Sequence, residues 1–493
     1  MDLILDGNGP MYLQVVRALK EAVAVGRLET GARLPSTRDL AVDLDVSRTT
    51  IVAAYEHLRA EGFIQGKVGS GSYISSPWRF NGRQAVAQFA VPPQSNYSRR
   101  LRANDDINSL PGRRPPGMRY AFQFGLPIVS NTITTQWARQ LAKVAPYVRP
   151  NYPMPGGQPG LKDAVARHVM RTRGVACTAD DVLIVTGATQ ALSLLSRVLL
   201  DEGDLVAIED PHWMGARCVF QLSGAVVQGV PVDASGIRTD RLPDRPAKLT
   251  YVTPSHQFPT GAVLTHERRI ALLDYARAGS GWIVEDDYDG EFRHERRAVE
   301  ALQSLDRDGR VVYVGSFSKS LFPALRLGYV VAPPTLREDL LAAKWASDYG
   351  TPSLEQTALE ELIRSGTFDR HLRYVTRKLA ERRAVLRRSL VEELGDRIEI
   401  LDSHSGMHFM LWINGLSIRD GDALVSAAAA RQLAIYPVTR CYFDPPERLG
   451  LIMGFSAISA KEIPAAVKVL AEAIHSLDQR LDRNAGVRPA RSI

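Results

Sequence analysis

The sequence predicts a multidomain α/β protein, with a small helical N-terminal unit followed by a larger domain. Two observations lead to this fold class. Residues 1–76 contain short amphipathic helical patterns and then two glycine-flanked strands, whereas residues 120–483 alternate apolar strand runs with helical patterns. That alternation predicts a mostly parallel sheet with crossover helices and a smaller C-terminal subdomain. Residues 77–119 are rich in Pro, Arg, Asn, Gln and Ser and lack apolar periodicity, which is typical of a flexible linker.

The composition places limits on the class of protein. At 493 residues, with 45% hydrophobic and 23% charged residues, the chain can bury a core in each domain. The net charge of +7 permits an acidic partner such as nucleic acid. Cys177, Cys218 and Cys441 have no metal-ligand spacing, which favours a reducing, intracellular setting. Because the N-terminus lacks a basic region followed by an apolar run, and no uncharged run reaches membrane-spanning length, we expect a cytoplasmic protein.

The N-terminal unit has the pattern of a winged helix-turn-helix. A first helix is expected over residues 12–25, and a second, capped by Ser36, runs through Leu44. A third helix follows over residues 48–61 after a three-residue joint, with Ser47 as its N-cap. Residues 62–74 read as two short strands about a glycine turn, which would form the wing.

Small donors and a guanidinium gather at the start of the third helix, the end that enters a major groove in such motifs. A further arginine begins the preceding helix, and a lysine and a glycine occupy the wing tip. For any one of these residues a solvated helix cap is an equally good interpretation. The candidate DNA contacts are Arg38, Ser47, Arg48, Thr49, Thr50, Lys67 and Gly69.

In the larger domain, polar groups follow three apolar strands. Lys319 comes just after the strand at residues 311–314, with Arg326 seven residues later. Small residues, Thr186 to Thr189, separate the strand at residues 182–185 from a helix, where backbone N–H groups and the helix dipole favour an anion. Acidic residues at 285–287 follow the strand at residues 282–284, and a carboxylate there can keep a cofactor's ring nitrogen protonated. An anion cradle, an acid, a lysine and an arginine together predict a pyridoxal phosphate pocket.

These motifs resemble those of a known family. Residues 120–480 resemble the fold-type I, aspartate aminotransferase-like fold, and the segments at 34–41 and 46–50 are similar to the GntR-type winged helix. The whole chain resembles the MocR/GabR-like subfamily of GntR transcription regulators. The resemblance implies that Lys319 forms the internal aldimine with pyridoxal 5'-phosphate, that Asp286 pairs with the pyridine nitrogen, and that Tyr288 bonds the ring oxygen. It also implies a phosphate site at Ala188, Thr189, Ser316 and Arg326, ring stacking by Trp213, and Tyr152 reaching the phosphate from a second subunit.

Two positions depart from the aminotransferase pattern. Phe258 stands where aminotransferases have an asparagine that bonds the ring oxygen, and a phenyl ring cannot make that bond. His256 or Gln257 is the candidate to replace it. Ile452 stands where aminotransferases have an arginine for the substrate carboxylate, and Arg440 is the candidate for that role on an effector. Both departures favour a regulator over an enzyme.

We therefore expect a dimeric regulator that binds double-stranded operator DNA and senses a small amine, an amino acid or pyridoxal phosphate itself through aldimine exchange at Lys319. Bound to DNA in a bacterium, it would be associated with the nucleoid. The alternatives are a working aminotransferase with a fused DNA-binding domain, and a regulator whose pocket is empty and only dimerises. No metal site is expected, because His404 and His408 have no third ligand. A charged helix over residues 370–394 would lead into the C-terminal subdomain, and the tail, residues 484–493, is expected to be disordered.

Overall fold

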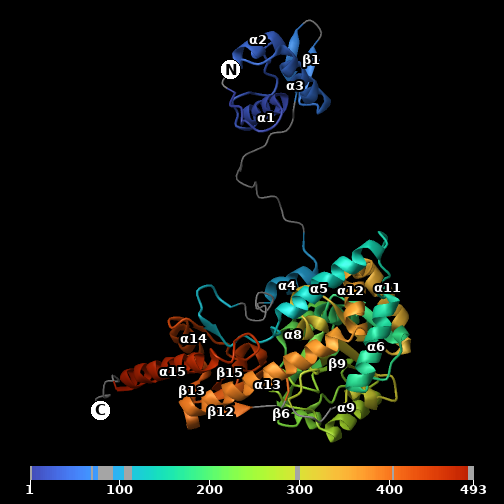
Figure 1. The fold of residues 1–493 in the computed structure, drawn as a ribbon, viewed down its shortest axis with the longest axis vertical. Coiled ribbons are helices and arrows are strands. Elements are labelled where there is room, and N and C mark those ends of the chain that lie inside the picture. The colour runs from blue at the N-terminus through green and yellow to red at the C-terminus, as the bar shows by residue number, and fades with distance from the viewer. Residues whose placement is uncertain are drawn as a thin grey trace. The chain divides into compact units, whose positions relative to one another are not determined.

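The computed structural model describes residues 3–67, 70–75, 93–104, 114–294, 300–401 and 405–486. The chain divides into two compact units, Met1–Pro93 and Gln94–Ile493, each considered by itself below (Figure 1). Among the described residues, no helix is long and apolar enough to cross a membrane. None of the three cysteines forms a disulfide.

The N-terminal unit has the predicted order of elements. Its helices are α1 (Met11–Ala24), α2 (Thr37–Asp43) and α3 (Arg48–Ala60), followed by the antiparallel strands β1 (Ile64–Lys67) and β2 (Gly71–Ile74). The two predicted caps are present, because the Ser36 hydroxyl accepts from the Asp39 N–H at 3.2 Å and the Ser47 hydroxyl from the Thr50 N–H at 3.1 Å. Buried apolar side chains from all three helices and both strands form one core, so the unit has the contacts of an independent fold.

The large unit is built on one eight-stranded sheet with the order β4-β11-β10-β9-β8-β5-β6-β7. The central pairs are parallel, whereas β11 lies antiparallel to both β4 and β10 and β7 is antiparallel to β6. The sheet is therefore mostly parallel, as predicted. Its strands are β4 (Val182–Val185), β5 (Leu205–Asp210), β6 (Val226–Asp233), β7 (Gly236–Ile237), β8 (Leu249–Val252), β9 (Trp282–Asp287), β10 (Val311–Ser316) and β11 (Gly328–Val331).

Both faces of this sheet are covered. Leu183 and Val185 of β4 contribute to one buried cluster, while Val182 and Ile184 contribute to another, as the period of two in a strand requires. Figure 1 shows β9 enclosed by the surrounding helices. Those helices are α5 (Asn131–Val144), α6 (Pro159–Arg173), α7 (Ala188–Leu199), α8 (Met214–Ser223), α9 (His266–Ala278), α10 (Phe317–Ser320), α11 (Arg337–Asp348) and α12 (Ser353–Arg364).

The C-terminal subdomain begins with the predicted long helix, α13, which spans Thr367–Leu394 and ends at Gly395. It packs on a three-stranded antiparallel sheet with the order β12-β13-β15 and on the last helix. A two-residue strand near residue 120 pairs with another near residue 433 and ties the start of the large unit to this subdomain. The elements are β3 (Tyr120–Ala121), β12 (Ile398–Leu401), β13 (His408–Ser417), α14 (Gly421–Ala429), β14 (Leu433–Ala434), β15 (Arg448–Gly454) and α15 (Ile463–Gly486).

Two sequence-based predictions need correction. The segment predicted as a flexible linker, residues 77–119, contains helix α4 (Asn96–Ala103), which Ser95 caps and which contacts α8 of the large unit. Apolar periodicity could not reveal this helix, because none of its residues is buried. The disordered tail was predicted to begin at 484, but α15 continues to Gly486. Residues 487–493 lie outside the described residues.

Candidate functional site

Strand register brings the predicted pocket residues to one edge of the sheet. Val185, the last residue of β4, pairs with Gly328 of β11, and Gly328 pairs with Ser316 of β10. On the other side of β10, Val314 pairs with Asp286 of β9. The end of β4, the end of β10 and the acidic end of β9 therefore lie in one row. The carboxyl ends of strands in an open α/β sheet are where ligands bind.

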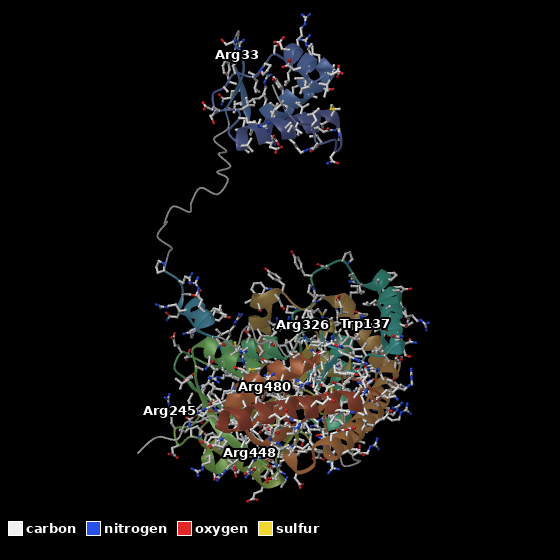
Figure 2. All side chains as sticks on the ribbon, turned by 90° about the vertical axis from the view of Figure 1, so that its left-hand side faces the viewer. Arg33, Trp137, Arg245, Arg326, Arg448 and Arg480 are labelled. Atoms are coloured by element: carbon white, nitrogen blue, oxygen red, sulfur yellow. The ribbon has the colours of Figure 1, made fainter. Side chains whose placement is uncertain are left out.

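The start of α7 and Arg326 form an anion cradle. Gly187 precedes the helix with φ of 117°, and no side chain caps the helix N-terminus. A Cβ atom at Gly187 would lie 3.5 Å from the guanidinium of Arg326, which is labelled in Figure 2. This guanidinium makes no hydrogen bond or ion pair with any described residue, while the Ser316 hydroxyl accepts from the Ser318 N–H at 3.1 Å. Exposed N–H groups, a guanidinium and a hydroxyl suit a phosphate group, so Ala188, Thr189, Ser316 and Arg326 fit their predicted role.

Asp286 carries a buried acceptor without a partner. Its Oδ2 atom accepts from the Tyr251 hydroxyl at 2.7 Å, whereas Oδ1 is buried and has no hydrogen-bond partner. Burial raises the pKa of Asp286 to about 7, against the lowering effect of the Tyr251 hydrogen bond. A protonated pyridine nitrogen would supply the missing donor and a compensating charge, so this carboxyl fits the cofactor. Tyr251 was not predicted, although its strand β8 lies beside β9 in the sheet.

Lys319 points into the protein. It lies on the short helix α10, and its Nζ donates to the carbonyl oxygen of Gly125 at 2.5 Å. Burial lowers the pKa of the lysine, and the charges of Asp289 and Asp286 oppose that effect. A lowered pKa increases the fraction of neutral amine, which is the form that attacks a carbonyl. Asp289 is a second carboxylate in the Lys319 environment that the sequence did not predict.

Tyr288 belongs to a buried hydrogen-bond network. His256 Nδ1 lies 2.9 Å from the Tyr288 hydroxyl and 2.9 Å from Asp289 Oδ2. Burial raises the pKa of Tyr288 well above its usual value, so the phenol stays protonated and can donate. Three side-chain atoms that could bind a metal ion, one each from His256, Asp289 and His408, lie within 4.8 Å of one another. The sequence did not reveal this group. Because Asp289 and Tyr288 both contact His256, we interpret the group as one that positions the Tyr288 hydroxyl. His404, which was considered with His408 as a metal ligand, lies outside the described residues.

The wall beside Tyr288 is apolar. Phe258 packs against Phe124, with ring centroids 5.6 Å apart, and both share a buried cluster with Ile452. Trp213, immediately before α8, packs against the same cluster. Gln257 cannot replace the missing asparagine, because its amide donates to the carbonyls of Pro211 and Phe258 at 2.7 and 2.6 Å.

Two predicted residues are not joined to this group. Tyr152 is 82% exposed and lies against Tyr349, with ring centroids 5.7 Å apart. Arg440 is exposed and lines a different cavity, together with Arg100 and Arg217. None of the other predicted cofactor-binding or effector-binding residues lines that cavity.

In the N-terminal unit, the start of α3 is open to solvent. Ser47, Arg48 and Thr49 are exposed, Thr50 is half-buried, and Arg38 on α2 is exposed. The Ser47 hydroxyl lies 2.8 Å from the hydroxyls of both Thr49 and Thr50, which fixes this small polar cluster. Gly69 and the side chain of Lys67 lie outside the described residues.

Two further arginines support the wing, and the sequence did not single them out. The Arg59 guanidinium donates to the Ser72 hydroxyl at 3.0 Å. Arg33, labelled in Figure 2, lies 3.2 Å from the position of a Cβ at Gly71. Arg33 precedes α2 and Arg59 lies in the last turn of α3, so only the folded unit brings them to the strands.

Comparison with known proteins covers both units. Residues 11–74 match the family of bacterial regulatory proteins of the gntR family, and residues 129–470 match aminotransferase class I and II. The chain is 33% identical over 478 residues to the probable rhizopine catabolism regulatory protein MocR of Rhizobium meliloti, covering 96% of this chain and 95% of that protein. It is also 33% identical to the HTH-type transcriptional regulator TauR of Rhodobacter capsulatus, covering 95% of this chain and 97% of that protein. Among solved structures it is similar to LysN, the alpha-aminoadipate aminotransferase of Thermus thermophilus complexed with N-(5'-phosphopyridoxyl)-L-leucine, with a TM-score of 0.70, 27% identity, and coverage of 78% of this chain and 98% of that one.

Proposed function

This chain belongs to the MocR/GabR-type regulators, which join a gntR-family DNA-binding domain to a class I and II aminotransferase domain, and we propose that its large unit senses a small amine or amino acid at Lys319. The protein is a DNA-binding transcription regulator whose cofactor is pyridoxal 5'-phosphate. The proposal concerns what the pocket detects and which residues do so.

One observation carries this proposal. A buried carboxyl with a free acceptor atom, Asp286, is charge-coupled to a half-buried lysine of lowered pKa, Lys319. When bound, pyridoxal phosphate supplies an aldehyde that combines reversibly with amines and a ring that withdraws electrons. Lys319 would hold the cofactor covalently until an effector amine displaces it.

The other residues would bind and orient the cofactor. Asp286 would keep the ring nitrogen protonated, and Tyr288, held by His256, would donate to the ring oxygen in place of the missing asparagine. Trp213 would cover the ring face. The phosphate would be held by Ala188, Thr189, Ser316 and Arg326, with Tyr152 contributed by the partner in a homodimer.

The apolar wall supports sensing over turnover. Phe258 and Ile452 are buried where an aminotransferase would place an asparagine and an arginine, so a substrate carboxylate would meet no fork of donors there. Arg440 remains our proposal for an effector carboxylate. An amine that reacts with the cofactor but is poorly oriented for proton transfer would change the pocket without completing a reaction.

The output would be DNA binding by the N-terminal unit. We propose that the start of α3 enters a major groove with Ser47, Arg48, Thr49 and Thr50, and that Arg38, Lys67 and Gly69 contact the flanking backbone. A homodimer would read two half-sites. Sensing requires that the effector-bound and effector-free pockets differ in affinity for the operator.

The test combines one variant with two readouts. Wild type and Lys319→Ala are titrated with a panel of amines and amino acids, while absorbance of the cofactor and fluorescence anisotropy of the DNA upstream of the protein's own gene are recorded. We expect the variant to lose the covalent absorbance and every amine-dependent change in DNA affinity, but to keep DNA binding. Lys468→Ala, an exposed lysine on α15, is the matched control. A full amine response by Lys319→Ala refutes the proposal, and sustained keto-acid production by wild type would establish an aminotransferase instead.

A further inference from the structure

A second cavity, of about 530 Å³, lies where α4 meets the large unit. Figure 1 shows α4 close to α8. Three arginines line the cavity: Arg100 on α4, Arg217 on α8, and Arg440. The polar residues Asn104, Gln221 and Tyr442 also line it. Among the described residues of its lining, none carries a carboxylate.

Arg100 and Arg217 differ in how their charges are compensated. Arg100 pairs with Glu202 at 2.9 Å. Arg217 has no such carboxylate partner within the described part of the chain. Its guanidinium lies 4.3 Å from the centre of the Phe443 ring, and its buried Nε atom has no hydrogen-bond acceptor. Asp210 is the neighbouring acid, and its carboxylate accepts from the Phe443 N–H at 3.1 Å. A buried donor without an acceptor is costly, and a planar guanidinium fits carboxylate and phosphate groups especially well.

The same cavity residues attach α4. No residue of α4 is buried, so apolar packing contributes little to its position. The contacts that hold it are polar: Arg100 Nε donates to the Leu222 carbonyl at 3.1 Å, and the Asn104 amide donates to Gln221 at 3.2 Å. Arginines from α4 and α8 line one cavity, and repulsion between their like charges would oppose this attachment. An anion between them would replace repulsion by attraction on both sides.

We propose that this cavity binds the oxyanion group, phosphate or carboxylate, of a small molecule, and that the bound anion fastens α4 to α8. The volume is in the range of small-molecule sites. None of the residues proposed to hold the cofactor lines this cavity, and the proposal does not depend on amine sensing at Lys319. Arg440, proposed above for an effector carboxylate, is the one residue that the two proposals share.

The test uses the full chain saturated with pyridoxal phosphate, so that the phosphate cradle at α7 is filled. Inorganic phosphate and succinate are titrated separately by calorimetry at constant ionic strength, and amide hydrogen exchange is followed in α4. We expect saturable binding of at least one of them and slower exchange over Asn96–Ala103. Phosphate binding alone would identify a phosphate site, and succinate binding alone a carboxylate site.

Paired variants make the result specific. Arg217→Gln should lower the affinity for the anion by about tenfold or more, since it removes a charge-assisted hydrogen-bonded pair. Arg245→Gln, an exposed arginine labelled in Figure 2, should leave binding unchanged. If Arg217→Gln does not fold, Arg440→Gln, at another residue of the cavity lining, provides the same comparison. The proposal is overturned if neither anion binds saturably, if the variant and its control bind alike, or if exchange in α4 does not respond.

Discussion

Asp286→Asn should have opposite effects on the empty and the loaded protein. Burial raises the pKa of this carboxyl from 3.8 to about 7, so the folded apoprotein holds its proton more tightly than the unfolded chain does. Below the unfolded pKa the carboxyl is protonated in both states and costs nothing. As pH rises through the folded pKa the cost becomes complete, and at about 1.36 kcal/mol for each pKa unit it reaches roughly 4 kcal/mol at pH 8.

Asparagine cannot ionise, but its amide oxygen can still accept from Tyr251. We therefore expect urea denaturation to find the Asp286→Asn apoprotein about 2 to 4 kcal/mol more stable than wild type at pH 8, with almost no difference near pH 4. The same change should weaken pyridoxal phosphate by roughly 1.5 to 3 kcal/mol, since the charged acceptor for the ring nitrogen is lost. Asp308→Asn, an exposed acid, controls for the loss of one carboxylate.

The reasoning requires that Asp286→Asn raise the stability of the apoprotein at pH 8 and lower its affinity for the cofactor. An apoprotein variant that is less stable than wild type at pH 8 would mean that the free Oδ1 atom is satisfied in solution and that burial does not strain this carboxyl. An unchanged cofactor affinity, measured by absorbance titration, would remove Asp286 from the cofactor site.

Three further predictions concern other parts of the molecule. Gly187→Ala places a side chain at φ of 117° beside Arg326, so it should cost about 1 to 2 kcal/mol of stability and also weaken cofactor binding. Its control, Gly203→Ala, has φ of 90° in open space and should cost stability alone. Equal cofactor affinity in the two variants would argue against the cradle. Asp289→Asn removes the charge that most opposes the lowering of the Lys319 pKa, so the pKa of this lysine should fall further. The pH midpoint for capture of pyridoxal phosphate by the apoprotein should fall with it, as measured by stopped-flow absorbance. A midpoint that rises would contradict the assigned coupling. Arg48→Ala should weaken DNA binding and, if the arginine contacts a phosphate, reduce the slope of log affinity against log salt by about one. The control Arg197→Ala, in the large unit, should change neither quantity. Unchanged DNA binding by Arg48→Ala would exclude this arginine from the DNA interface.

Local patterns were sufficient for the elements and for the residues next to them. Capping serines, apolar runs and the strand-to-helix turn at Gly187 are encoded within a few residues, so Ser36, Ser47 and Lys319 could be placed from the sequence. The strand predicted to end at Val284 continues to Asp287, because the acidic residues still pair with β10. Only the ladder shows that the acids belong to the strand.

Long-range partners could not be predicted in this way. Tyr251 meets Asp286 from a neighbouring strand, and Asp289 meets His256 across 33 residues, so no spacing rule connects them. Helix α4 escaped prediction because its attachment is polar rather than apolar. The three arginines of the second cavity come from segments more than a hundred residues apart and meet only in the folded chain.

The central claim is that Lys319 holds the cofactor. Borohydride reduction of the protein saturated with pyridoxal phosphate, followed by proteolysis and mass spectrometry, tests it most directly. The account predicts a phosphopyridoxyl group on the peptide that contains Lys319, lost when an effector amine is added before reduction. A group found only on other lysines, or none at all, would contradict it.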